Sequence, residues 1–371
     1  MLIQSHLTQV FKFFLISLVL SACSTTRALK NQPYSINFID EFTVPSKFEF
    51  EGKTFGGISG IDYRDGYLVM VNDSPSNPLI FKAKLNLSSF QKRELEFTSV
   101  IELKDDQFFE KNALDMESIR FDDGEYIIST EGNIDKGFSP RIFNVSSKGK
   151  YLEDYPLPDY FLPQGENSPR DNGVFEGLAM DLDADGFWFA TELPLIRDGK
   201  APKLYNTNSP VRLSYFNRSR NQITQQYAMD LDRITKVPLL PFAVNGLTEI
   251  LQLNEHQFLI LERSYSAGHK SHGNKVKLFL LDISKATDIK AITSLKDAPQ
   301  NIEYAQKSLL FDFKSIREKL TDQVVDNLEG LCYGPTLKNG NKTLIIVSDD
   351  NFSSFGPQLN QVIILELIKN Q

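Results

Sequence analysis

The sequence predicts an all-β protein, a β-propeller built from four-stranded antiparallel blades. From about residue 31 onward the segments are short, rich in Val, Ile, Phe and Tyr, and bounded by Gly, Asp and Asn, as strands are. A pair of motifs recurs five times: a strand-like segment with an acidic residue, then a turn, then a second segment that ends in acid. The pairs are 56–62 with 71–74, 115–120 with 129–133, 175–179 with 190–194, 246–250 with 261–264, and 328–331 with 347–351. Such repetition indicates one supersecondary unit copied around an axis.

The third repeat can be followed through a complete blade. Two strands, Gly177–Asp181 and Phe187–Thr191, flank an Asp- and Gly-containing turn. After a long loop, Val211–Phe216 and Gln222–Leu231 form a second pair of strands around a polar turn at 217–221. Four consecutive antiparallel strands are the unit of a propeller blade.

The other repeats fit the same plan. The third and fourth strands are expected at Leu79–Leu85 and Glu94–Leu103, at Arg141–Val145 and Lys150–Leu157, and at Val276–Asp282 and Lys307–Phe313. The fifth repeat has a third strand at Gln361–Ile368 and no residues left for a fourth. The later repeats are longer, so five blades are detectable and a divergent sixth is left open.

The segment Tyr34–Val44 is strand-like and precedes the first repeat. We expect it to complete the last blade, so that the N-terminal strand closes the ring and no sheet edge stays free. Without a linker rich in Pro, Gly or Ser, residues 34–371 are read as a single domain, with one helical excursion at Ile316–Val325.

The first residues predict export. Phe11–Ala22 is an apolar run too short for a permanent membrane span, and Leu20-Ser-Ala-Cys23 is similar to a bacterial lipobox. Residues 1–22 are therefore read as a lipoprotein signal peptide, Cys23 as the lipidated residue and 23–33 as a lipid-anchored linker. Ser24 favours the outer membrane, on its periplasmic side in a Gram-negative cell envelope. The alternative is an ordinary signal peptide with a chance Cys.

The composition limits the classes of partner that the protein can bind. The chain is 41% hydrophobic, which is typical of a globular protein. Its net charge of −8 argues against a nucleic acid as partner. Apart from the lipidated Cys23, Cys332 is the one Cys of the mature chain, so no intramolecular disulfide is possible, and we expect it to be a small buried hydrophobe. We expect a monomer that touches the membrane only through its lipid.

The recurring acids should converge. Innermost strands and their return strands begin and end at one rim, which would bring together Asp73, Glu117, Glu131, Glu176, Glu192, Glu249, Glu262, Glu329, Asp349 and Asp350. Crowded carboxylates destabilise a fold unless cations compensate, and Ca²⁺ prefers oxygen ligands. One or more Ca²⁺ ions are therefore predicted. The alternative role for each Glu is to cap backbone N–H groups between blades.

Basic residues accompany these acids, among them Arg64, Arg120 and Arg263. Arg263 directly follows Glu262 and could grip a phosphate or carboxylate, or could pair with a ring Glu. His269 and His272 lie in a Gly- and Ser-bearing loop without a third zinc ligand nearby. No nucleophile elbow, Walker loop or dinucleotide fingerprint occurs.

Several motifs resemble those of the phytase-like propeller family, often labelled "esterase-like activity of phytase". They are Ile58-Ser-Gly-Ile-Asp62, Met116-Glu-Ser-Ile-Arg120, Asn172-Gly-Val-Phe-Glu-Gly-Leu-Ala179, Leu261-Glu-Arg-Ser264, Asn327-Leu-Glu-Gly-Leu331 and Val347-Ser-Asp-Asp-Asn-Phe352. The resemblance runs from about Gly56 to the C-terminus in unbroken order. It implies Ca²⁺ held by carboxylates, substrate phosphate bound beside it, and a basic side chain that steadies charge on phosphorus. Glu176, Glu329, Arg263 and Arg120 are the catalytic candidates.

The resulting hypothesis is a cell-envelope hydrolase, a Ca²⁺-dependent phosphoesterase or esterase acting on a small anionic ester. The negative net charge argues against tight binding of a hexaphosphate. The alternative is a non-enzymatic propeller lipoprotein that binds an envelope ligand or protein on its acidic rim. Hydrolysis of a sugar lactone, by analogy with other propellers, is a third possibility.

Overall fold

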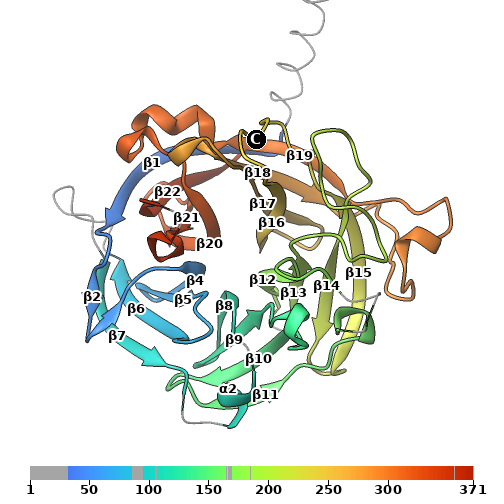
Figure 1. The fold of residues 1–371 in the computed structure, drawn as a ribbon, viewed down its shortest axis with the longest axis horizontal. Coiled ribbons are helices and arrows are strands. Elements are labelled where there is room, and N and C mark those ends of the chain that lie inside the picture. The colour runs from blue at the N-terminus through green and yellow to red at the C-terminus, as the bar shows by residue number, and fades with distance from the viewer. Residues whose placement is uncertain are drawn as a thin grey trace, which may run out of the picture.

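The computed structural model is a ring of five four-stranded antiparallel sheets, which are the blades of a β-propeller (Figure 1). The structure describes residues 32–85, 95–104, 107–112, 114–163, 165, 169–183, 185–354 and 356–370. The proposed signal peptide at 1–22, the lipidation residue Cys23 and almost all of the 23–33 linker lie outside these residues. No helix in the described ranges is both long and apolar enough to cross a membrane.

Each blade consists of strands that follow one another from the axis of the ring to its periphery. The first four blades are β4(Ile58–Arg64), β5(Tyr67–Asn72), β6(Leu79–Leu85) and β7(Leu95–Glu102); β8(Met116–Asp122), β9(Glu125–Thr130), β10(Arg141–Ser146) and β11(Tyr151–Asp154); β12(Phe175–Met180), β13(Gly186–Thr191), β14(Pro210–Asn217) and β15(Gln222–Asp230); and β16(Ala243–Gln252), β17(Gln257–Ser266), β18(Asn274–Asp282) and β19(Gln306–Asp312). The predicted strands are therefore confirmed to within a few residues.

The fifth blade closes the ring with a strand from the other end of the chain. It contains β20(Asn327–Thr336), β21(Lys342–Asp349), β22(Asn360–Lys369) and, outermost, β1(Tyr34–Val44). β1 pairs antiparallel with β22 from Tyr34 opposite Lys369 to Val44 opposite Asn360. The predicted closure is confirmed, and the described chain forms five blades without a sixth.

The hydrophobic core lies between neighbouring blades, so each blade is buried on both faces. The interface of blades three and four contains Trp188, Leu213 and Phe258, whereas Phe175, Phe187 and Phe216 belong to the interface of blades two and three. Each of the remaining three interfaces has its own cluster. Cys332 is fully buried between blades five and one, as expected of a small hydrophobe.

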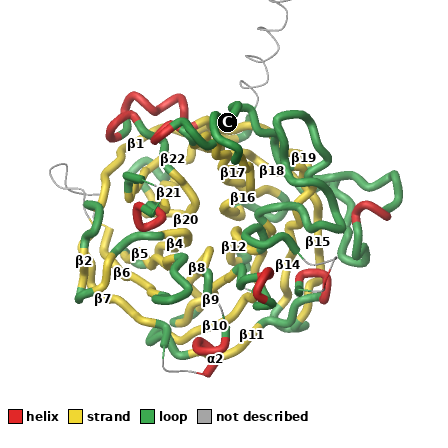
Figure 2. Tube along the Cα trace, viewed as in Figure 1, coloured by secondary structure: helices red, strands yellow, loops and turns green. Residues whose placement is uncertain are grey.

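Helical segments are short and lie in the connections between strands (Figure 2). They are α2(Gln107–Lys111) and the 3-10 turns η1(Ile134–Lys136), η2(Asp159–Phe161), η4(Lys270–His272), η5(Leu295–Asp297), η6(Phe313–Lys319), η7(Thr321–Gln323) and η8(Asn351–Ser353), beside a small hairpin of β2(Glu49–Phe50) and β3(Lys53–Thr54). The helix expected at 316–325 is instead two 3-10 segments separated by Leu320. The side chains of Phe313, Ile316 and Leu320 in this part of the chain pack on blades four and five. This packing holds the segment in place without a longer helix.

Candidate functional site

The innermost strand of every blade contains a β-bulge at an equivalent position, toward the end of the ring where the strand starts. A bulge leaves one residue without a partner on the neighbouring strand and re-aims its side chain. The pairing skips one residue in each of β4, β8, β12, β16 and β20, and the skipped residues are Ser59, Glu117, Glu176, Thr248 and Glu329. All five bulges lie at the same end of the ring, because all five innermost strands start there.

The second strand of each blade returns to that end. The residues that follow the partner of the bulge are Asp73, Glu131, Glu192, Arg263 and Asp349. Together with the five bulge residues they form one rim, which we call the acidic ring. The fourth blade contributes Thr248 and Arg263 to it, whereas each of the other blades contributes at least one acid.

Two predicted ligands of the fourth blade lie outside the acidic ring. Glu249 and Glu262 are each displaced by one residue from the ring positions, which Thr248 and Arg263 occupy. Because successive side chains of a strand point to opposite faces, a shift of one residue sends a side chain to the other side of the sheet. The motif Leu-Thr-Glu-Ile does not reveal this shift, since either its Thr or its Glu could be the bulged residue.

Glu249 instead forms a buried ion pair at the centre of the ring with Arg120, 2.7 Å away. Its carboxylate also accepts hydrogen bonds from Ser118 Oγ (2.8 Å) and from the backbone N–H of Leu178 (2.8 Å). In three blades a Gly takes the corresponding place, and a Cβ at Gly60 would come within 2.5 Å of the Ser118 backbone. The inner strands thus approach closely around this pair.

Arg120 is only 2% exposed and its guanidinium holds four blades together. Nη1 donates to the carbonyls of Ile61 (2.6 Å) and Ile119 (2.7 Å), and Nη2 donates to those of Leu331 (3.2 Å) and, more weakly, Ile250 (3.5 Å). Both terminal nitrogens are directed at backbone carbonyls and Glu249, Nε is buried without a partner, and the side chain is closed off from solvent. This geometry favours a structural role for Arg120 over the predicted catalytic one.

The carboxylate of Glu262 is also engaged in contacts inside the protein. One oxygen forms an ion pair with Lys307, and the other accepts hydrogen bonds from Asn245 Nδ2 and the backbone N–H of Asp232, both at 3.1 Å. Asp350 is similarly engaged, because it accepts from the backbone N–H of Gly57 (2.9 Å) and from Asn360 Nδ2 (3.1 Å). With both oxygens partnered, these two carboxylates are poorly suited to bind metal.

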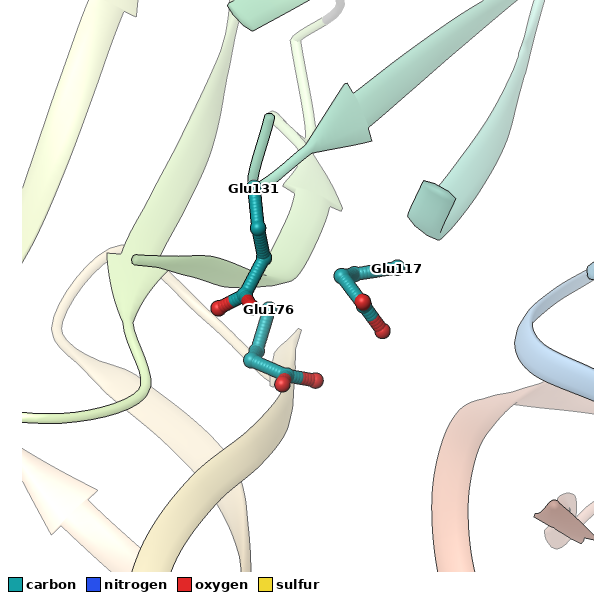
Figure 3. Close-up of side chains that lie close together, drawn as sticks. All are labelled: Glu117, Glu131 and Glu176. Carbon is teal, nitrogen blue, oxygen red and sulfur yellow. The ribbon is translucent and has the colours of Figure 1, made fainter. Parts of the chain in front are cut away.

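Three predicted ligands do meet. Glu117, Glu131 and Glu176 extend from β8, from the residue after β9, and from β12, and their carboxylates face one another across a common space (Figure 3). One oxygen from each lies within 4.8 Å of the others, and all three residues are buried. Val174 N–H donates to Glu131 Oε1 (2.6 Å), which fixes that carboxylate on the neighbouring blade.

The charges of this triad are strongly unfavourable without a cation. Burial, followed by the charges of neighbouring acids, raises the pKa of Glu117, Glu131 and Glu176 well above the ordinary value. Burial likewise raises the pKa of Glu192 to about 7 and that of Asp73 to about 8, with Glu329 adding to both. Each carboxylate is thus destabilised as an anion.

Glu329 and Asp349 complete the acidic ring on the fifth blade. Asn327 Nδ2 donates to Glu329 Oε1 (2.9 Å) and to Asp349 Oδ2 (3.0 Å). The two carboxylates share this donor and therefore lie close together. Burial and then the charge of Glu329 raise the pKa of Asp349 well above its usual range. The structure therefore gathers Asp73, Glu117, Glu131, Glu176, Glu192, Glu329 and Asp349 at one end of the axis, and leaves Glu249 and Glu262 out of the ring.

Arg263 is the cationic member of the ring. Its Nη2 lies 3.1 Å from Glu329 Oε1 and 3.9 Å from Glu192 Oε1, and its side chain is 14% exposed. Burial alone would lower the pKa of the guanidinium, but the charges of Glu329, Glu192 and Glu176 raise it overall. Its Nε is buried without a partner. Arg263 is thus a fixed positive charge beside the carboxylates, with one donor unused.

The residues fit a hard divalent cation on two observations. Glu131 Oε2, Glu176 Oε2, Glu192 Oε2 and Asp73 Oδ1 are buried and have no hydrogen-bond partner. Two oxygens bound to one Ca²⁺ are at most about 5 Å apart, because each lies about 2.4 Å from the ion. The spacing of the triad meets this limit. Unpaired buried carboxylate oxygens at this spacing are what a Ca²⁺ ion would satisfy.

One member of the cluster was not predicted from the sequence. Asp115 precedes β8 by one residue, and burial, followed by the charges of Glu329 and Asp171, raises its pKa to about 7. Its carbonyl accepts the backbone N–H of Glu131 (3.0 Å), which ties it to the triad's own blade. Its position beside Met116-Glu117 was the available signal, because a residue just before the first strand also lies at the rim.

Comparisons with known proteins give one family and several distant structures. A family model described as "Phytase-like: Esterase-like activity of phytase" matches residues 53–352. The comparison with curated proteins found no match.

Among solved structures, the chain is similar to the extracellular domain of a proposed hybrid two-component system from B. thetaiotaomicron (14% identity, TM-score 0.34), with 85% of this chain covered but only 28% of that one. It is also similar to an exo-1,5-α-L-arabinanase from a bovine ruminal metagenomic library (9%, TM-score 0.42, 86% and 95% covered). A third is the aldose sugar dehydrogenase of Streptomyces coelicolor (9%, TM-score 0.37, 90% and 98% covered). These scores are too low to support an inference about activity.

Proposed function

This chain belongs to the phytase-like family, whose model matches residues 53–352, and from that premise we propose that it is a Ca²⁺-dependent ester hydrolase, most specifically a phosphoesterase, acting at the acidic ring. The observation that carries the proposal is the buried triad of Glu117, Glu131 and Glu176 with unpaired carboxylate oxygens beside a fixed arginine. A structural set of ion pairs would leave few such oxygens unpaired.

The triad would hold the cation, with Asp73 and Glu192, which each have an unpaired oxygen, as further donors around it. A bound Ca²⁺ would polarise a phosphoryl or carbonyl oxygen and lower the pKa of a bound water. The protein's own contribution is to fix the ligands: Glu131 is held by the Val174 N–H, and the bulges at Glu117 and Glu176 direct these side chains to the same space.

Arg263 has the geometry to steady developing negative charge. Its guanidinium is held by Glu329 and Glu192 at the edge of the triad, and Nε retains a free donor. A preorganised donor of this kind in a buried site stabilises a transition state more than it would in water. Glu329, whose Oε1 lies 3.1 Å from Arg263 Nη2, would position this side chain.

We further propose that the protein acts in the cell envelope, exported by residues 1–22 and anchored through a lipid on Cys23. The lipobox-like Leu20-Ser-Ala-Cys23 supports this placement. The substrate would be a small anionic ester, because a ring of carboxylates needs its cation to attract an anion, and the chain would act as a monomer without nucleic acid.

The test is turnover of p-nitrophenyl phosphate and p-nitrophenyl acetate by the purified protein, with Ca²⁺ and with a chelator. We expect turnover that depends on Ca²⁺ and is lost in Glu176→Gln. The matched control is Glu255→Gln, because Glu255 lies in the turn between β16 and β17 at the opposite end and its side chain is 88% exposed. Equal rates with and without metal, or an unaffected Glu176→Gln protein, would reject the proposal.

A non-enzymatic binding propeller is the second candidate, and one observation favours it. Arg263 is already paired with Glu329, which is the arrangement expected of a self-contained structural network. Binding of Ca²⁺ in calorimetry, without turnover of any ester in the presence of the ion, would select this candidate.

A further inference from the structure

A cavity of about 680 Å³ lies outside the acidic ring, between the fourth and fifth blades. It is bounded by the start of β18, the loop before β16 and the 3-10 segment η6. Because β17 ends and β18 starts at the end of the propeller where the acidic ring lies, the cavity opens on that same face. None of the residues of the acidic ring lines it.

One half of this cavity is cationic, although the whole chain carries a net charge of −8. Lys236, Lys275, Lys314 and Arg317 line it, and within the described ranges none of these four has a carboxylate partner at ion-pair distance. Asp312 is the acid that lines the cavity, and its Oδ1 already accepts the backbone N–H of Lys314 (2.9 Å). The positive charges therefore exceed the local negative charge.

These cations are close enough to repel one another. Burial, and then the charges of Arg317 and Lys275, lower the pKa of Lys236. Burial also lowers the pKa of Lys275. The charge of Asp312 opposes this shift, and the charges of Lys277, Lys314 and Arg317 add to it. A bound anion would relieve this repulsion.

A donor in the cavity wall is unused. Arg317 Nε is buried and has no hydrogen-bond partner among the described atoms. Lys275 Nζ, by contrast, donates to Thr235 Oγ1 (2.8 Å), and Lys236 Nζ donates to the carbonyl of His272. The guanidinium is therefore the group best placed to receive a phosphate, which it binds through two N–H donors.

The other half of the cavity is apolar. Val276 and Val325 are buried in its wall, whereas Val237 and Leu239 line it from the loop before β16 and are 65% and 69% exposed. Leu240 and Phe242, in the same loop, are 59% and 58% exposed. Four large apolar side chains that face solvent in one loop are unusual unless they bind something.

We propose that this cavity binds a phosphate ester that carries an apolar group, independently of the acidic ring. The phosphate lies against Arg317 and Lys275, and the apolar group covers Val237 and Leu239. Two sources share this chemistry, a soluble phosphate ester and a phospholipid headgroup with the first part of its chains. The inference goes beyond the proposed hydrolysis and does not depend on it.

The experiment is calorimetric titration of the protein, with a chelator present, using dihexanoyl phosphatidic acid and inorganic phosphate as probes. We expect phosphatidic acid to bind more tightly than phosphate. Arg317→Gln and Lys275→Gln should each weaken its binding about tenfold or more, as expected for loss of a charged hydrogen bond. Leu239→Ser should weaken the binding of phosphatidic acid but leave the binding of inorganic phosphate unchanged.

Two controls separate this site from the rest of the molecule. Lys338→Gln removes an exposed Lys in the turn between β20 and β21 and should leave binding unchanged. Glu176→Gln should also leave it unchanged, so that failure of the acidic ring and failure of this cavity are distinguished. Thermal unfolding of each variant verifies that the fold is retained.

Vesicles of phosphatidylcholine, with and without phosphatidic acid, identify the source. Binding of the soluble probe identifies a soluble ester, whereas binding only to vesicles that contain phosphatidic acid identifies a bilayer. Both results support the site if Arg317→Gln abolishes them. The proposal is overturned if neither the soluble probes nor the vesicles that contain phosphatidic acid bind, or if binding survives in both Arg317→Gln and Lys275→Gln.

Discussion

Single residues of the fourth blade decide which side chains reach the acidic ring. Thr248 occupies the bulge position that Glu117 and Glu176 hold in their own blades, and Arg263 occupies the place of Glu131 and Glu192. A displacement of one residue therefore converts Glu249 from an apparent metal ligand into the partner of Arg120. The same sequence motif thus performs two different tasks.

The first prediction concerns this central ion pair. Replacing Arg120 with Met should lower the free energy of unfolding by about 3–5 kcal/mol, because Glu249 would be left buried without its cation. The change should be measured by chemical denaturation, with the exposed Arg64→Met as the matched control. Glu249→Leu added to Arg120→Met should restore part of the loss, since it removes the isolated charge. An Arg120→Met protein as stable as the wild type would contradict the structural role.

The second prediction distinguishes Arg263 from a merely structural residue. Arg263→Gln should lower kcat/KM for p-nitrophenyl phosphate about 100-fold, as is typical when one preorganised donor is lost. It should not weaken Ca²⁺ binding, because removing a positive charge leaves Glu329 and Glu192 more available to a cation. Kinetics and calorimetry on the same protein measure both. Weaker Ca²⁺ binding together with unchanged kcat/KM would reverse the assignment.

At the scale of elements, strands were predictable and their irregularities were not. Alternating apolar segments between Gly-, Asn- and Asp-rich turns located β6(Leu79–Leu85) and β1(Tyr34–Val44) to the residue. The bulges could not be predicted from the sequence, because each adds one residue without a distinctive composition. The 3-10 segments η6 and η7 were also missed as such, since tertiary packing of Phe313 and Ile316 overrides the local helical pattern.

The third prediction tests the closing strand. A chain that begins at Pro45 lacks β1, which leaves β22 as an unpaired edge and uncovers apolar side chains of the fifth blade. We expect a thermal midpoint lower by at least 10 °C or so, consistent with the loss of several kcal/mol, and concentration-dependent aggregation. Scanning calorimetry and light scattering measure these effects. A synthetic peptide of residues 34–44 should raise the midpoint again, and unchanged stability of the shortened chain would show that closure is dispensable.

At the scale of the whole molecule, the ring brings together residues that are distant in the sequence. Arg120 binds carbonyls from β4, β8, β16 and β20, and the triad draws on blades two and three. Each blade is an incomplete unit that buries its two faces only against its neighbours. Stability and the acidic ring are therefore both properties of the closed ring.

The fourth prediction follows from the raised pKa values of the acidic ring. Burial raises the pKa of Asp115 and Glu192 to about 7 and that of Asp73 to about 8, above their values in the unfolded chain. Between about pH 4 and pH 8 the folded state therefore binds more protons than the unfolded state. Without metal, the free energy of unfolding should fall as the pH rises through this window.

Added Ca²⁺ should oppose that fall. The ion replaces the protons, so its stabilising effect should be larger at pH 8 than at pH 5, and binding should release protons. Thermal unfolding at several pH values, with Ca²⁺ and with a chelator, measures both parts. Stability without metal that rises toward pH 8 would show that the carboxylates are not destabilised as the structure indicates.

The sequence by itself determined the family, the propeller of four-stranded blades and its closure by the N-terminal strand, whereas the structure decided between five blades and six. These depend on the order of apolar segments and turns, which is written locally along the chain. It also identified most carboxylates of the ring, because Glu117, Glu131 and Glu176 recur within recognisable motifs.

Only the tertiary structure decided which of the repeated acids share the rim and which hold the blades together. Glu249, Glu262 and Arg120 lie in motifs that match their neighbours, yet their side chains turn to the interior. The reason is physical: a side chain's direction depends on strand register, and the register of each inner strand is set by a bulge and by contacts across the ring axis.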